Sequence, residues 1–276
     1  MKVLDLFSGI GGFSLGFERA GMETIAFCEY DEHARAILKK HWPETPIYKD
    51  VRELDATKYR GTIDIVCGGF PCQDLSIAGK KAGFDGERSS LYREMLRIIG
   101  ECLPRFAVFE NVTGLLTGES GRWFAKFLFD LAEIGFDAEW HCISASYLGA
   151  SHHRDRVWIV AYPKSEHDRT CNNKSTKRQK QEPGKGSSRI KIFADADADA
   201  KRCQRFAKIA DDLKQQVELM RSSEDDRRRF DLSEPALCGA NDGVPKRLDR
   251  LRRLGNSVVP QIPEVIGRAI MTLEGK

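Results

Sequence analysis

The sequence lacks an apolar run long enough to cross a membrane, which takes about 20 consecutive residues. Its first residues, Met1 to Asp5, also lack the basic start and apolar stretch of a secretory signal peptide. We therefore expect a protein without membrane segments that works in the cytoplasm.

Paired metal ligands are missing too. The eight cysteines are scattered, mostly within apolar runs, and no Cys-x-x-Cys pair occurs at zinc-binding spacing. His152 and His153 stand apart from any second pair of ligands. We expect no metal site, and reduced thiols rather than disulfides.

The chain has no excess of one charge sign, because 44 Lys and Arg residues stand against 41 Asp and Glu. The formal net charge of +3 gives no signal for a polyanionic partner over the whole molecule, so any basic surface has to be local. Residues 164–191 do carry a local bias, with nine Lys or Arg residues against three Asp or Glu. At 276 residues and 41% hydrophobic content, the chain can form one large domain, or a domain and a smaller one.

Residues 2–7 predict a buried strand that runs into a glycine turn at residues 8–12 and then into a helix. The turn contains three glycines, Gly9, Gly11 and Gly12. Glycines let a backbone approach a ligand such as a nucleotide or adenosine closely. The third glycine of the dinucleotide fingerprint is absent, because Ser14 stands in its place, and this counts against NAD.

Acidic residues follow the next two predicted strands. Glu29 ends the strand at residues 24–28, at the distance where an acid hydrogen-bonds both hydroxyls of a ribose. Asp50 follows the short strand at residues 46–49, where it could accept from an adenine amino group. Each acid alone could be an ordinary turn residue. Together with the glycine turn, they predict a site for an adenosine-containing cofactor.

A loop with a cysteine follows the predicted strand at residues 63–67. Gly68 and Gly69 end the strand and begin the loop, and Pro71 fixes one backbone angle beside Cys72. The residues after Cys72 are polar or small, unlike those around a buried structural cysteine, and open α/β sheets bind ligands on such loops. Cys72 is therefore a candidate nucleophile, which would act as a thiolate. A chance Pro-Cys in a turn is the alternative.

Further along the chain, charged residues also lie at the ends of predicted strands, at the edge of the sheet where we expect Cys72. Glu110 follows the apolar strand at residues 106–109, which favours a partly desolvated carboxylate over a surface cap. Arg154 and Arg156 enter the strand at residues 157–161 two positions apart, so they point the same way. They suit one anionic or carbonyl-bearing target, with a surface charge pair as the alternative.

Composition divides the chain into three parts. Residues 1–162 hold the predicted sheet, and residues 163–243 form a basic, polar insert with an Ala-Asp repeat at 194–200. Residues 244–276 return to an ordered pattern that contains a Gly-Asn-Ser turn at 255–257 and a closing helix. We expect this turn to pack against the first glycine turn.

Five of these stretches, in this order, resemble motifs of the cytosine-5 DNA methyltransferases, bacterial and phage enzymes of modification systems. They are Asp5-Leu6-Phe7-Ser8-Gly9-Ile10-Gly11-Gly12-Phe13, Gly69-Phe70-Pro71-Cys72-Gln73, Glu110-Asn111-Val112, Arg154-x-Arg156 and Gly255-Asn256-Ser257-Val258-Val259-Pro260. His152 stands where the family's Gln-x-Arg-x-Arg motif has glutamine. The resemblance covers residues 1–162 and 244–276.

The resemblance implies an α/β fold with a doubly wound, mostly parallel sheet of the S-adenosylmethionine-dependent methyltransferase type. Residues 163–243 would be a small target-recognition insert, and S-adenosylmethionine would be the cofactor. The residues expected to bind it are Phe7, Gly9, Gly11, Gly12, Glu29, Asp50, Pro71 and Asn256.

The resemblance also implies a DNA (cytosine-5-)-methyltransferase that acts on a flipped-out cytosine in double-stranded DNA. Cys72 would add to carbon 6 of the base, and Glu110 would hold ring nitrogen 3 and the amino group. Arg156 would hold the carbonyl oxygen of the base, and Arg154 the neighbouring phosphate or Glu110.

Double-stranded DNA is the expected partner, and a cognate restriction endonuclease is a second partner that the resemblance raises. We expect no membrane partner, and a monomer. Two alternatives remain open, namely the same chemistry on RNA and a catalytically impaired DNA-binding homologue. An NAD oxidoreductase is disfavoured by Ser14 and has no need of Cys72.

Overall fold

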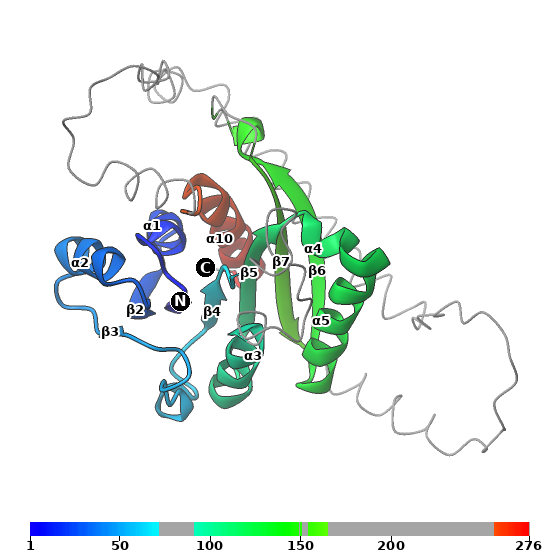
Figure 1. The fold of residues 1–276 in the computed structure, drawn as a ribbon. Helices are drawn as coiled ribbons and strands as arrows, with labels where there is room; N and C mark the ends of the chain where they lie inside the picture. Colours follow the sequence, from blue (N-terminus) through cyan, green and yellow to red (C-terminus); the bar gives the residue numbers. More distant parts are fainter. Residues whose placement is uncertain (72–90, 149, 151–153, 165–256, 276) are drawn as a thin grey trace, which may run out of the picture.

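The computed structural model describes residues 1–71, 91–148, 150, 154–164 and 257–275 (Figure 1). Within these ranges the chain forms a seven-stranded sheet in the order β3-β2-β1-β4-β5-β7-β6. The strands from β3 to β5 are parallel, and β7 runs antiparallel between β5 and β6. The predicted doubly wound, mostly parallel α/β fold is confirmed.

The elements lie close to the predicted ranges. The strands are β1 (Lys2–Leu6), β2 (Glu23–Cys28), β3 (Ile47–Tyr48), β4 (Ile65–Gly68), β5 (Phe106–Val112), β6 (Phe136–Ser144) and β7 (Asp155–Pro163). The α-helices are α1 (Gly12–Arg19), α2 (Glu32–His41), α3 (Leu91–Cys102), α4 (Gly114–Thr117), α5 (Arg122–Glu133) and α10 (Gln261–Leu273). The 3-10 helices are η1 (Thr57–Tyr59), η3 (Gly118–Gly121) and η4 (Ala145–Leu148).

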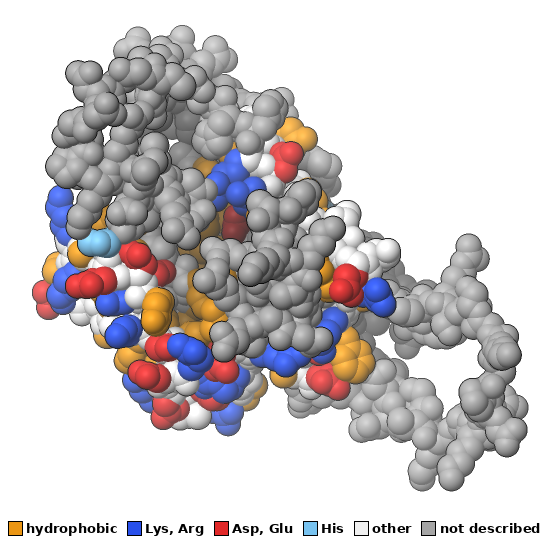
Figure 2. Space-filling view, in the orientation of Figure 1, with side chains coloured by type: hydrophobic (Ala, Val, Ile, Leu, Met, Phe, Trp, Pro, Cys, Tyr) orange, Lys and Arg blue, Asp and Glu red, His pale blue; other side chains and the backbone are white. Residues whose placement is uncertain are grey.

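Charged side chains of both signs alternate on the surface around α2 and α3 (Figure 2). This mixture agrees with the small formal net charge of +3. None of the helices in the described ranges is both long and apolar enough to span a membrane.

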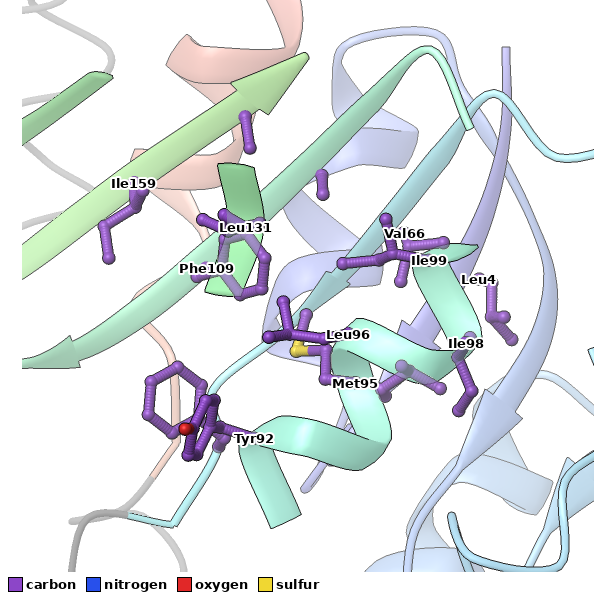
Figure 3. Packing of buried hydrophobic residues seen from close by; sticks show 14 of the residues in the cluster. Leu4, Val66, Tyr92, Met95, Leu96, Ile98, Ile99, Phe109, Leu131 and Ile159 are labelled. Atoms are coloured by element: carbon purple, nitrogen blue, oxygen red, sulfur yellow. The ribbon is translucent and has the colours of Figure 1, made fainter. Parts of the chain in front are cut away.

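The sheet is covered on both faces because its central strands are apolar on both sides. Leu4 and Val66 belong to the core under α3 and α5, whereas Val3 and Ile65 belong to the core under α1 and α10. Figure 3 shows the first core, where Leu4 and Val66 lie opposite Ile99 and its neighbours on α3. Continuous apolar strands are typical of a parallel sheet with helices on both faces.

Helix α3 shows why apolar residues at helical spacing form a helix in this fold. Tyr92, Met95, Ile99 and Cys102 recur at helical spacing, and all four are buried. Burial of a large apolar side chain stabilises the fold by about 1.5–3 kcal/mol, which exceeds the differences in helix propensity. The apolar spacing of this stretch therefore accounts for the helix.

Helix α10 lies beside α1, although the two come from opposite ends of the chain (Figure 1). A Cβ atom at Gly12 would lie 2.5 Å from the carbonyl oxygen of Val258, and one at Gly16 would lie 2.3 Å from that of Pro260. The described end of the predicted Gly-Asn-Ser turn, Ser257, directly precedes this contact. The C-terminal segment therefore packs on the helix that starts at the glycine turn, while Gly255 and Asn256 of the predicted turn lie outside the described residues.

Candidate active site

The candidate residues gather at one edge of the sheet because β1 to β5 run parallel. The chain leaves β1, β2 and β4 at Phe7, Glu29 and Gly69, so these exits share an edge. Strand β5 extends to Val112, so Glu110 lies within its last three residues at that edge, whereas the sequence predicted it after the strand. Strand β7 runs the opposite way and therefore brings its start to the same edge. Arg156, for example, pairs with Val112 in the sheet register.

The turn after β1 has an unusual backbone. Phe7, Gly9 and Gly11 all have positive φ angles, of 52°, 55° and 88°. For Phe7, a residue with a Cβ atom, such a conformation costs of the order of 1–3 kcal/mol and is most often found at functional sites. A Cβ atom at Gly9 would meet no atom of the described residues within 4 Å, so these residues leave the space beside the turn open.

Glu29 ties this turn to the end of β2. Its Oε2 accepts from the backbone N–H of Gly9 at 2.7 Å, and its Oε1 accepts from that of Asp31 at 2.7 Å. Each carboxylate oxygen has a further lone pair, which a ligand hydroxyl can use. The structure thus brings the acid at the end of β2 to the glycine turn.

Asp50 follows β3 and is engaged by a neighbour. Arg52 donates from Nε to Oδ1 at 2.9 Å and from Nη2 to Oδ2 at 2.6 Å. This hydrogen-bonded arginine lowers the pKa of Asp50, so the side chain stays an ionised acceptor near neutral pH. The sequence analysis did not single out Arg52.

Asp5 and Ser14 form a buried pair beneath the turn. Ser14 Oγ donates to Asp5 Oδ2 at 2.7 Å, and both residues are fully buried. Burial raises the pKa of Asp5 to about 7, against the opposing effect of the hydrogen bond from Ser14. Ser14, which the sequence analysis considered only as a missing glycine, therefore has a structural role. An acid within the apolar run Val3-Leu4-Asp5-Leu6 was the signal for it.

Glu110 and Arg156 form an ion pair at the centre of the edge. Arg156 Nε lies 3.0 Å from Glu110 Oε1. Burial raises the pKa of Glu110, although the charges of Arg156 and Arg154 oppose the shift. A Cβ atom at Gly69 would lie 3.0 Å from Glu110 Oε2, so the second carboxylate oxygen faces the start of the loop that leads to Cys72.

Arg154 lies immediately before β7, near this pair. Burial lowers its pKa, and the positive charge of Arg156 adds to that effect, whereas Glu110 opposes it. A buried acid between two arginines can accept and donate hydrogen bonds at neighbouring atoms of a planar polar ligand.

Asn111 anchors the same loop, and the sequence analysis assigned it no role of its own. Its buried side chain donates from Nδ2 to the Phe70 carbonyl at 3.2 Å and accepts from the Val112 N–H at 2.9 Å. The Phe70 ring stacks on Phe127 with centroids 5.6 Å apart. The backbone just before Pro71 is therefore held from both sides.

Two exposed tyrosines at this edge were also missed. Tyr30, which directly follows Glu29, is 68% exposed, and Tyr147 of η4 is 57% exposed. The backbone N–H of Ala145, at the start of η4, donates to the Arg154 carbonyl at 3.2 Å, which places this helix beside the arginines. Exposed aromatic rings of this kind stack on nucleobases.

Three residues of the sequence analysis lie outside the described residues. They are Cys72, the candidate nucleophile, Asn256 of the final motif, and His152. Pro71 is the last described residue before Cys72, so the structure brings the approach to the nucleophile beside Glu110 and Arg156.

Known proteins resemble this chain in sequence. The family model described as C-5 cytosine-specific DNA methylase matches residues 1–233. The type II methyltransferase M.Eco47II of Escherichia coli is 39% identical over 161 residues, which are 58% of this chain and 39% of that protein. The type II methyltransferase M.NgoBI of Neisseria gonorrhoeae is 35% identical over 161 residues, 58% of this chain and 50% of that protein. The chain therefore matches half or less of the length of these curated relatives.

Solved structures agree on the fold. A DNA modification methyltransferase encoded within an E. coli prophage is 30% identical with a TM-score of 0.50, over 59% of this chain and 47% of that one. The Entamoeba histolytica methyltransferase EhMeth, at 19% identity, has a TM-score of 0.51 over 68% of this chain and 57% of its own, which bears on the fold alone. Because the family model spans most of the sequence, the chain belongs to the C-5 cytosine-specific DNA methylase family.

Proposed function

We propose that this chain methylates carbon 5 of cytosine in double-stranded DNA, through a covalent adduct of Cys72 with a flipped-out base. The observation that carries the proposal is the partly buried Glu110–Arg156 pair, whose carboxylate faces Gly69 at the start of the loop to Cys72. Unstacking the base costs roughly a few kcal/mol, and flipping is needed because no side chain reaches carbon 6 within the duplex.

The glycine turn fits S-adenosylmethionine, the cofactor of this family. Space is open beside Gly9, and the Glu29 carboxylate stands next to it with lone pairs for ribose hydroxyls. Asp50 would accept from the adenine amino group, and Tyr30 offers a ring for stacking. Phe7, Gly11, Gly12, Pro71 and Asn256 complete the proposed set. When bound, the cofactor supplies a methyl group activated on a sulfonium.

The chain's own residues would activate the base. The Cys72 thiolate forms a bond to carbon 6, and the electron pair of the 5,6 double bond moves toward carbon 5. Glu110 donates a proton to ring nitrogen 3 as charge develops there. We place that proton on Oε2, because Oε1 is paired with Arg156. Burial raises the pKa of Glu110, which favours the protonated form that this step needs.

The arginines hold the base while the remaining steps restore its aromatic ring. Arg156 donates to the carbonyl oxygen of the base, and Arg154 to the neighbouring phosphate or to Glu110. After methyl transfer, a base removes the carbon 5 proton, and the bond between carbon 6 and Cys72 breaks. The cysteine leaves as a thiolate, the proton on ring nitrogen 3 returns to Glu110, and the general base passes the carbon 5 proton to solvent, so the chain returns to its starting state.

Base trapping tests the covalent step. The full chain is incubated with S-adenosylmethionine and a duplex library in which 5-fluorocytosine replaces cytosine. Fluorine cannot leave carbon 5 as a proton does, so the parent should give a protein–DNA complex that survives denaturation, and Cys72→Ala should give none. Trapping by Cys72→Ala, or none by the parent, would refute the role of Cys72.

Bisulfite sequencing of DNA from cells that express the chain tests the substrate and reveals the target sequence. We expect protected cytosines at a short recurring site with the parent chain and none with Cys72→Ala. Recurring protected sites of the kind that restriction enzymes cleave would support a partner endonuclease, which the names of the curated relatives raise.

A further inference from the structure

Trp42 closes the side of the glycine turn that faces α2. A Cβ atom at Gly11 would lie 2.6 Å from ring atoms Cη2 and Cζ3 of Trp42 and 3.1 Å from Cδ2 of Leu38. Gly11 therefore has two constraints, its φ of +88° and the ring against its α-carbon. The ring leaves the turn no room to move back toward α2.

Two contacts hold the ring, and a backbone hydrogen bond holds the residue. The ring Nε1 donates to Glu18 Oε1 on α1 at 2.6 Å, and the ring centroid lies 5.2 Å from that of Phe27 on β2. The Trp42 backbone N–H donates to the Leu38 carbonyl at 2.7 Å. Trp42 thus joins the end of α2 to α1 and to the sheet. These contacts fix the position of the ring against the turn.

Helix α2 also contacts the other side of the candidate cofactor site. Its N-cap residue, Asp31, accepts from the Ala34 N–H at 2.8 Å and donates its own N–H to Glu29, whose carboxylate accepts from Gly9. The contacts form a closed circuit from Gly9 through Glu29 and α2 to Trp42 and back to Gly11. Core packing alone does not require both ends of one helix to meet the same turn.

We propose that Trp42 is a positioning residue for the cofactor site, which sets the place of Gly11 and of the amide groups around it. The inference rests on the proposed function, because it concerns the turn that would hold S-adenosylmethionine. Glu18 acts through Trp42, since its carboxylate fixes the orientation of the indole.

The test compares three variants of the full chain with the parent. Trp42→Leu keeps an apolar side chain but removes the ring, and Glu18→Ala keeps the ring but removes the acceptor of its N–H. Trp140→Ala is the matched control, because Trp140 lies on edge strand β6 and packs on Phe124 with centroids 4.8 Å apart. S-adenosylhomocysteine affinity is measured by calorimetry, and amide hydrogen exchange is measured without ligand.

We expect Trp42→Leu to weaken S-adenosylhomocysteine binding by about tenfold to a hundredfold, as small displacements in a preorganised site do. Glu18→Ala should weaken it by about threefold, the effect of one hydrogen bond, and Trp140→Ala should leave it unchanged. In Trp42→Leu, exchange should accelerate at residues 8–12 and remain unchanged in β5 and α5.

Parent-like affinity in Trp42→Leu would overturn the proposal. So would faster exchange spread evenly over the chain, which would mean that Trp42 only stabilises the fold. A parent chain that does not bind S-adenosylhomocysteine would refute the cofactor assignment, and the proposal with it. The exchange data would then still show whether the ring restrains the turn.

Discussion

Carboxyl groups at one edge of the sheet experience different surroundings. Asp5 is fully buried, Glu110 is partly buried near two arginines, and Asp50 is hydrogen-bonded by an exposed arginine. Burial disfavours the charged form, whereas a cation favours it. The pKa therefore rises for Asp5 and Glu110 and falls for Asp50. One sheet edge thus combines two acids whose affinity for a proton is raised with one acid, Asp50, whose affinity is lowered.

Asp5 should make stability depend on pH. Its folded pKa of about 7 lies above the ordinary value of 3.8, so the folded state binds its proton more tightly than the unfolded state. The free energy of unfolding should then fall as pH rises through this range, by roughly 4 kcal/mol at most. Urea unfolding at several pH values measures this effect.

Asp5→Asn is the comparison for that measurement, because the amide still accepts from Ser14 but does not titrate. Other carboxyl groups contribute equally to both proteins, so the difference between their pH profiles isolates Asp5. We expect that difference to change between about pH 4 and pH 7 and to be level above it. Parallel profiles would contradict the raised pKa.

Glu110→Gln should slow methyl transfer without weakening cofactor binding. The amide oxygen can still accept from Arg156, but the side chain can no longer supply the proton to ring nitrogen 3. We expect the rate to fall by about 10²–10⁴-fold. Transfer of tritiated methyl groups measures the rate, and calorimetry measures S-adenosylhomocysteine binding.

Glu139→Gln is the control for that change, since Glu139 lies on β6 and accepts from Tyr162 at 3.2 Å. It should transfer methyl groups at the parental rate. Full activity of Glu110→Gln would rule out the proton transfer that we propose.

At the scale of elements, the contact between α1 and α10 depends on small residues. Gly16 lies inside α1, where alanine would normally raise helix stability by about 1 kcal/mol. A Cβ atom there would, however, lie 2.3 Å from the Pro260 carbonyl and 2.8 Å from the Glu264 nitrogen. Both neighbours are backbone atoms, so α10 would have to shift.

We therefore expect Gly16→Ala to destabilise the protein by about 1–3 kcal/mol, because overpacking outweighs helix propensity. Gly100→Ala is the matched control, since Gly100 lies inside α3 and a Cβ atom there would meet nothing within 4 Å. It should stabilise by about 0.5–1 kcal/mol. Thermal unfolding of both variants measures these changes in stability. A stabilising effect of Gly16→Ala would refute the close contact.

At the scale of the whole molecule, a net charge of +3 leaves DNA attraction to local groups. Residues 164–191, with nine basic and three acidic residues, are the proposed source, and all but residue 164 lie outside the described residues. Each phosphate neutralised contributes about −0.9 to the slope of log K against log salt. DNA affinity should therefore fall steeply with salt.

Replacing Lys177, Arg178 and Lys180 by alanine should flatten that slope by up to about 3 and weaken all sequences alike. Lys39 and Lys40, exposed on α2, provide the control, and their replacement should leave the slope unchanged. Filter binding over a salt series measures the slope for the parent chain and for both sets of variants. An unchanged slope in the triple variant would place the phosphate contacts elsewhere in the chain.

The sequence alone determined the elements and their order, because strands and helices follow local apolar patterns that persist in any packing. It also placed Glu29 and Glu110 at one edge, since each follows an apolar run of a parallel strand, although β5 continues past Glu110 to Val112. The assignment of Cys72, Arg154 and Asn256 to the chemistry, and the three-part division at 162 and 243, remain predictions.

Only the tertiary structure decided which side chains meet. Trp42 behind Gly11, Asn111 on the Phe70 carbonyl, and α10 on α1 join residues that are far apart along the chain. Such contacts depend on side-chain shape and on the hydrogen bonds left to satisfy after the sheet has formed, and no periodicity in the sequence encodes them. For the same reason Ser14 looked like a missing glycine until its hydroxyl was found on Asp5.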